Sequence, residues 1–132
     1  DRANLSNSIQ ADLFIAIHQN SLENDTVTSG VETWYLPKDA YSEGLATCVQ
    51  EAVAEATGAR SIGIKSEVSM FVNRETTAPS VLLETGFVTT PSELEKLISD
   101  EYQDKIAEGV VDGIEKFFMS HELPPSKYTG NA

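Results

Sequence analysis

A histidine and a glutamate each end a largely apolar stretch of this sequence. The stretch from Ala11 to Ile17 leads into His18, and Val81–Leu83 leads into Glu84. Apolar runs without polar alternation are typical of strands covered on both faces, and the functional crevice of an open α/β sheet lies outside the carboxyl ends of its strands. If the two strands run parallel, both side chains reach the same edge of one sheet.

An imidazole and a carboxylate at one sheet edge favour metal-assisted hydrolysis. The neutral imidazole can bind zinc, and the carboxylate can take a proton from a metal-bound water. A structural role for His18 stays open, because a lone histidine is often a satisfied structural residue. Whichever role His18 has, Glu84 needs a partner, because burying an unpaired carboxylate is costly. That partner could be a metal, a cation or a backbone amide.

Apolar periodicity predicts the elements that position these two residues. Strands are expected over 11–18, 31–36, 69–74 and 81–83, with a polar loop over 60–67. Helices are expected over 41–57, from Pro91 with Thr90 as N-cap and Glu93 in a capping box, and over 101–120. The last helix should bury one stripe of residues: Tyr102, Ile106, Val110, Ile114, Phe117 and Phe118.

Strands alternating with helices predict a layered α/β/α domain with a mostly parallel, mixed sheet. The short spacing between the first two strands leaves room for one antiparallel pair. The chain length of 132 residues fits one domain, which we expect over 1–122, followed by a flexible tail or linker over 123–132.

Composition excludes several classes of function. The net charge of -12 argues against nucleic-acid binding, because it repels phosphate backbones. No apolar run reaches the roughly 20 residues needed to span a bilayer, and no signal-peptide pattern is present.

Three sequence blocks resemble the zinc-dependent N-acetylmuramoyl-L-alanine amidases in the same order. The segment 11–20 resembles the block that supplies the family's last zinc-binding histidine, 29–33 resembles its Gly-x-Glu strand start, and 74–87 resembles the block ending in its catalytic glutamate. Several ordered blocks are far more specific than one short motif. The resemblance implies an exported enzyme of the extracellular space or cell wall. It would use Zn²⁺ to cut the amide between N-acetylmuramic acid and L-alanine in peptidoglycan, with wall-binding modules carried separately.

Carried over position by position, the resemblance makes His18 a zinc ligand and Glu84 the general base. Asn20, Glu32 and Arg74 also fall in family motifs. Asn20 is expected to stabilise a turn, and Glu32 is either a solvated edge residue or a partner supporting the zinc site. Arg74 either ties a loop together or faces the substrate.

The resemblance also implies that the sequence begins inside the catalytic domain. The family takes a second histidine and a glutamate ligand from a segment upstream of these blocks, and we expect this chain to be the C-terminal two-thirds of the domain. A catalytic zinc needs about three protein ligands. The alternative function is therefore a catalytically inactive fragment that binds peptidoglycan or a partner protein.

Overall fold

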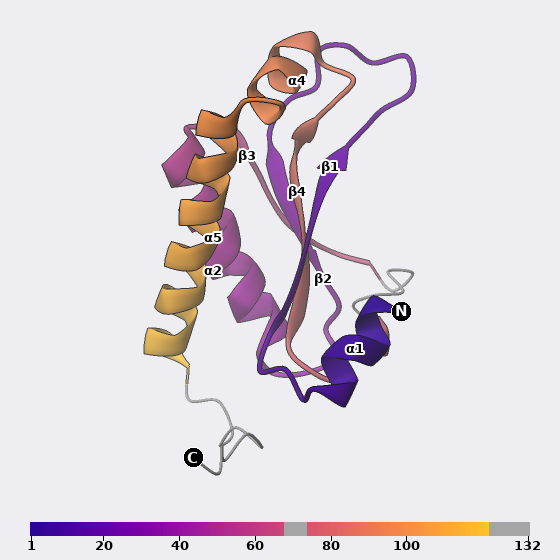
Figure 1. Cartoon of the computed structure of the whole chain (residues 1–132), viewed down its shortest axis with the longest axis vertical. Helices are drawn as coiled ribbons and strands as arrows, with labels where there is room; N and C mark the ends of the chain where they lie inside the picture. Colours follow the sequence, from indigo (N-terminus) through magenta and orange to yellow (C-terminus); the bar gives the residue numbers. More distant parts are fainter. Residues whose placement is uncertain (68–73, 122–132) are drawn as a thin grey trace.

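The computed structural model describes residues 1–67 and 74–121 and shows a sheet flanked by helices (Figure 1). Its four strands are β1 (Phe14–Asn20), β2 (Val31–Tyr35), β3 (Ser61–Ser66) and β4 (Ser80–Phe87), in the spatial order β1-β4-β2-β3. β1 is parallel to β4 and β2 is parallel to β3, whereas β4 and β2 are antiparallel. The predicted α/β class with a mixed, mostly parallel sheet is confirmed, but β4 separates the first two strands and itself forms the antiparallel pair.

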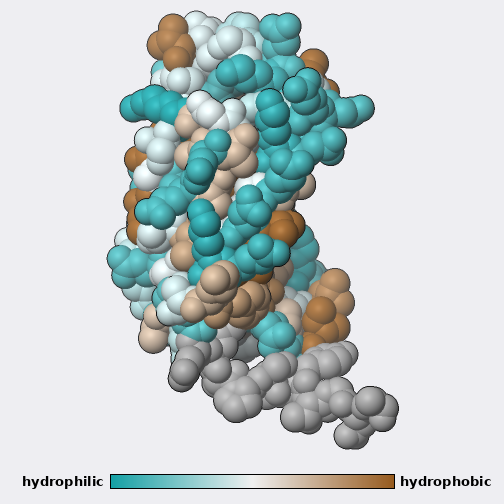
Figure 2. Space-filling model, turned by 90° about the vertical axis from the view of Figure 1, so that its left-hand side faces the viewer, coloured by the Kyte–Doolittle hydropathy of each residue, from teal (hydrophilic) through white to brown (hydrophobic). Residues whose placement is uncertain are grey.

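The helices are α1 (Arg2–Ser8), α2 (Ser42–Thr57), α4 (Pro91–Leu97) and α5 (Asp100–Ser120). α2 and α5 lie side by side along one face of the sheet, and α1 lies on the other side near the start of β1 (Figure 1). Figure 2 looks onto the helix-covered side, where hydrophilic residues dominate the surface. No helix within the described ranges is long and apolar enough to cross a membrane.

The core lies between the sheet and the α2–α5 pair. From β4 it takes Val81 and Leu83, both fully buried, and from α2 it takes Leu45, Val49 and Val53. α2 ends as expected at Gly58, whose φ of 71° is the left-handed conformation that glycine adopts at little cost.

The predicted stripe of α5 is confirmed for most of its members. Tyr102, Ile106, Val110 and Phe117 are buried and Ile114 is partly buried, whereas Phe118 is 46% exposed. Phe118 was wrongly placed because it lies about 100° around the helix from Phe117, outside the stripe.

Two glycines let α5 approach α2 closely. A Cβ at Gly109 would lie 2.7 Å from the Cα of Val53, and one at Gly113 would lie 2.8 Å from the Cα of Val49. Because both obstacles are backbone atoms, a side chain at either glycine would push the helices apart.

Residues 60–67 were wrongly predicted to be a loop, since most of them form β3. This is an edge strand with exposed Ser61, Lys65 and Ser66, and only its two isoleucines, separated by Gly63, are strongly apolar. The strand expected over 69–74 lies mainly outside the described residues, as does the tail over 123–132. Arg74 itself is helical and does not end a strand.

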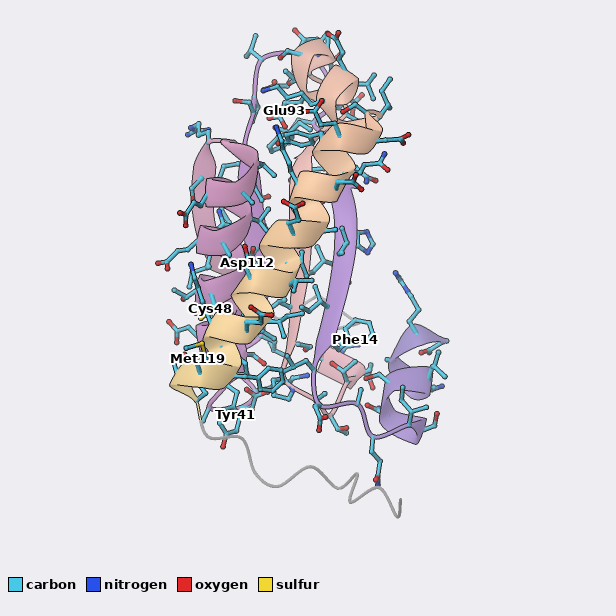
Figure 3. All side chains as sticks on the ribbon, turned by 60° about the vertical axis from the view of Figure 1, so that its left-hand side comes forward. Phe14, Tyr41, Cys48, Glu93, Asp112 and Met119 are labelled. Atoms are coloured by element: carbon cyan, nitrogen blue, oxygen red, sulfur yellow. The ribbon has the colours of Figure 1, made fainter. Side chains whose placement is uncertain are left out.

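Glu93 does not form the predicted capping box, although Thr90 is the N-cap of α4. The Glu93 carboxylate is buried and accepts hydrogen bonds from the backbone amides of Gly30 and Phe87, at the end of the molecule where β4 passes into α4 (Figure 3). It therefore joins the start of β2 to the end of β4.

The close helix contact generates a stability prediction. Gly113→Val should lower the free energy of unfolding by about 1–3 kcal/mol, because the new side chain overpacks the backbone of α2. Urea unfolding would measure it, with Asp112→Val as control, since Asp112 is exposed on the same helix. Helix propensity favours valine over glycine, so it cannot cause a loss at position 113. An equal loss in both variants would contradict the importance of the close helix contact.

Candidate functional site

Strand register places three ionisable residues in one row across the sheet. His18 of β1 is the direct partner of Glu84 on β4, and Glu84 is in turn the direct partner of Glu32 on β2. Directly paired residues project from the same face of a sheet. The expectation that His18 and Glu84 lie together in one sheet therefore holds, and the row lies on the face opposite the core residues Val81 and Leu83.

Glu84 is a half-buried carboxylate whose proton affinity is raised. Its Oε2 atom is buried and has no hydrogen-bond partner among the described residues. Burial raises the pKa of Glu84 above its usual 4.5, and the neighbouring Glu32 carboxylate raises that pKa further. A carboxylate with a free buried oxygen and an increased proton affinity is suited to accept a proton from a water or to bind a cation.

Glu32 is the most buried member of the row, with 4% of its surface exposed. Its Oε1 accepts a hydrogen bond of 2.8 Å from the side-chain amide of Asn20, and its Oε2 lies 2.9 Å from the Nζ of Lys65. Asn20 also accepts a hydrogen bond from the backbone amide of the next residue, Ser21. Both oxygens of the Glu32 carboxylate therefore have protein partners, and Glu32 has a supporting role in the row.

His18 stands at the β1 end of the row and is partly exposed. Its Nε2 lies 3.5 Å from a guanidinium nitrogen of Arg2 on α1, and its backbone carbonyl accepts a hydrogen bond from the hydroxyl of Thr85. The hydrogen bond from Thr85 to the His18 carbonyl joins β1 to β4 next to Glu84. The imidazole is thus held beside the Glu84 carboxyl by the strand pairing itself.

Arg74 is paired with its sequence neighbour: its Nε lies 3.0 Å from Glu75 Oε1. Arg74 is not one of the residues that line the pocket beside Glu84. The structure thus brings His18, Glu84, Glu32 and Asn20 together, and it places Arg74 in a separate contact.

A pocket of about 490 Å³ opens on this face, on the side of Glu84 that faces β2 and β3. It is lined by Asn20, Leu22, Thr28, Glu32, Trp34, Arg60, Ile62, Lys65, Glu84 and Phe87. Sequence reasoning missed Trp34, Arg60 and Lys65. Trp34 lies two residues after Glu32 on the same strand, so alternation along β2 could have identified it, whereas Arg60 and Lys65 depend on β3.

The described residues supply only part of a metal site. No group of three or more His, Cys, Asp or Glu residues gathers within them in a way that could hold an ion. His18 offers an imidazole and Glu84 an oxygen without a protein partner, while both oxygens of Glu32 are already engaged. In this row, His18 therefore fits the role of a metal ligand, and Glu84 beside it fits the role of a proton acceptor.

Comparison with known proteins identifies a family match and similar sequences. Residues 1–116 match the family model described as N-acetylmuramoyl-L-alanine amidase. The chain is 36% identical over 120 residues to the uncharacterized protein YqiI of Bacillus subtilis, covering 89% of this chain and 57% of YqiI. It is also 36% identical over 120 residues to the N-acetylmuramoyl-L-alanine amidase LytC of the same organism, covering 89% of this chain and 24% of LytC.

A solved structure is similar over almost the whole chain. The crystal structure of N-acetylmuramoyl-L-alanine amidase from Clostridium difficile 630 superposes with a TM-score of 0.86 and 41% identity, covering 92% of this chain and 66% of that one. The chain therefore spans the greater part of that structure but 57% or less of the two Bacillus relatives.

The Glu32–Lys65 pair generates a prediction about stability. Lys65→Met should destabilise the parent protein more than it destabilises the Glu32→Gln variant. In the parent, the substitution leaves the buried Glu32 carboxylate without its cation. A double-mutant cycle measured by urea unfolding should give a coupling of roughly 1 kcal/mol. The exposed pair Glu101 and Lys105 is the matched control, and its coupling should be near zero. Equal couplings would contradict the importance of burial.

The raised pKa of Glu84 generates a prediction about pH. The folded state holds the Glu84 proton more tightly than the unfolded state, so this contribution to stability is complete below 4.5 and is lost as the pH rises through the folded pKa. Glu84→Gln stays neutral and should therefore be more stable than the parent at about pH 8, with the difference shrinking towards about pH 5.

Urea unfolding with a chelator present measures this difference without interference from bound metal. Glu95→Gln, which changes an exposed carboxyl on α4, is the control. A difference for Glu84→Gln that stays constant with pH would show that burial does not penalise the charged form.

Proposed function

The chain belongs to the N-acetylmuramoyl-L-alanine amidase family, and on that premise we propose that it carries the catalytic glutamate of a zinc-dependent hydrolase. The bond cleaved is the amide between N-acetylmuramic acid and L-alanine in peptidoglycan. The observation that carries the proposal is the pairing of His18 with Glu84, whose Oε2 is buried without a protein partner. This is the arrangement expected where a water held next to an imidazole-bound metal must lose a proton.

His18 would provide one ligand to the zinc ion, which supplies Lewis-acid chemistry when bound. The remaining ligands would come from outside the described residues, since these contain no complete set. Family resemblance assigns them to an upstream histidine and glutamate.

Glu84 would move the protons of the reaction. It accepts a proton from the attacking water, whose oxygen forms the new bond to the carbonyl carbon, and it returns that proton to the nitrogen of L-alanine as the C–N bond breaks. Its raised pKa favours uptake of the proton, and the protonated carboxyl can then act as the acid. Glu32 would hold Asn20 and Lys65 in place around this carboxyl.

The proposal includes where the protein acts. A substrate in peptidoglycan places the activity outside the cytoplasm, at the cell wall. A net charge of -12 gives no long-range attraction to anionic wall polymers, so wall-binding modules carried separately would provide targeting. Arg74 would have a structural role, rather than a substrate-facing one, through its contact with Glu75.

A second candidate is binding of peptidoglycan or a partner protein without turnover. It is favoured by the incomplete ligand set of the described residues. The two candidates differ in zinc content, because only the hydrolase requires an ion held at His18.

Two substitutions in the full-length protein test the mechanism. Glu84→Gln should keep zinc while lowering turnover by roughly 10² to 10⁴-fold, because an amide cannot take the proton of the attacking water. His18→Ala should release zinc and abolish activity together, with partial recovery at high zinc concentration. Zinc content and peptide release from purified peptidoglycan are measured for both.

Three results would count against this assignment. Near-normal turnover by Glu84→Gln would mean that another residue is the base, and stoichiometric zinc in His18→Ala would make His18 structural. Peptidoglycan binding by the parent protein without zinc and without cleavage would support the second candidate.

A further inference from the structure

Two basic side chains line the pocket of a strongly acidic molecule. The whole chain has 9 basic and 21 acidic residues. Two of the nine basic residues, Arg60 and Lys65, line this one pocket together with Trp34. The pocket thus contains the Glu84 carboxyl, the Glu32–Lys65 ion pair and Arg60.

The two cations differ in how much of their charge is available. Lys65 pairs with the Glu32 carboxylate and lies over the Trp34 ring, with its Nζ 5.4 Å from the ring centroid. Arg60 is exposed, donates one hydrogen bond of 3.0 Å to the backbone carbonyl of Ser29, and forms no ion pair with a described residue. Its remaining guanidinium donors can therefore bind an anion.

The backbone around Arg60 is fixed by β2. The carbonyl of Arg60 accepts a hydrogen bond of 2.9 Å from the amide of Val31. This approach requires Gly30, which has a φ of 123° and where a Cβ would lie 2.7 Å from the same carbonyl oxygen. The guanidinium is thus attached to a fixed point of the sheet by its backbone and by the Ser29 contact.

The distance from Glu84 to the cations fits the peptide arm of a substrate. Strands lie about 4.8 Å apart, so β3 is about 10 Å from β4 across the sheet. An extended peptide advances about 3.4 Å per residue. A carboxylate carried two or three residues beyond the cleaved amide would reach Arg60.

We propose that Arg60 is a specificity-determining residue that binds a carboxylate on the peptide side of the cleaved amide. This rests on the proposed function, because it assumes that the amide is held beside Glu84. The planar guanidinium binds a carboxylate through two parallel hydrogen bonds, which a lysine cannot reproduce. The peptide then runs from β4 towards β3, over Trp34, and the glycan lies on the β1 side.

Binding of two soluble ligands to the full-length protein tests this orientation. One is an N-acetylmuramoyl peptide whose second residue carries a free carboxylate, and the other is the same compound with a carboxamide there. Calorimetry in the presence of a chelator prevents turnover. The parent should bind the carboxylate form about tenfold more tightly, and added salt should reduce this preference.

Variants assign the preference to one side chain. Arg60→Gln should bind both ligands equally, and Arg60→Lys should keep part of the preference because it keeps the charge. Lys105→Gln on α5 is the control, since it also removes one positive charge from an exposed residue but lies outside the pocket. Circular dichroism confirms that each variant is folded.

The inference is overturned if the parent binds both ligands equally or neither, or if Arg60→Gln keeps the preference. The proposed function is decided by a separate measurement, cleavage of the same ligands with zinc present. Preferential binding without cleavage would leave the Arg60 site standing and refute the hydrolase. Cleavage without a binding preference for the carboxylate would support the hydrolase and refute the Arg60 site.

Discussion

Two carboxylates face each other directly across the antiparallel strands β2 and β4, and most features of the site compensate for this arrangement. Like charges in directly paired positions destabilise a sheet, and burial of Glu32 increases the cost. Asn20 and Lys65 satisfy both oxygens of Glu32. The pKa of Glu84 is raised mainly by its own burial and further by the Glu32 carboxylate. The fold therefore stabilises the charge of one carboxylate by protein contacts and leaves one oxygen of the other without a partner among the described residues.

The arrangement depends on the order of the strands. β4 lies between β1 and β2, so one residue of β4 has a partner on each side and joins a histidine to a second glutamate. Side chains along β4 alternate between the two faces of the sheet. Val81 and Leu83 pack under α2 and α5, while Glu84 faces the pocket. The close packing of α5 on α2 through Gly113 fixes the helix layer on the first face. The candidate site therefore lies on the other face of the sheet.

Sequence reasoning succeeded where a local pattern is strong. His18 and Glu84 were identifiable because each follows an apolar run, and α5 because its apolar residues recur with the helical period. β3 was missed because its apolar alternation consists of only two isoleucines separated by a glycine, and the pocket cations Arg60 and Lys65 were missed with it. Glu93 has a correct local capping signature but is bound by Gly30, 63 residues away, so a tertiary contact overrides the local preference. The family resemblance supplied roles that the patterns alone left open.

Recognition at this site must act at short range. At physiological ionic strength charges are screened over about 8 Å, which is similar to the distance across two strands. The Arg60 cation therefore cannot offset the repulsion that a chain of net charge -12 exerts on a distant anionic polymer. Arg60 lines the pocket, however, and a ligand bound there would be within reach of direct hydrogen bonds, for which geometry matters more than net charge. On the proposed function, a negatively charged domain would thus select a negatively charged peptide at short range, with targeting to the wall provided separately.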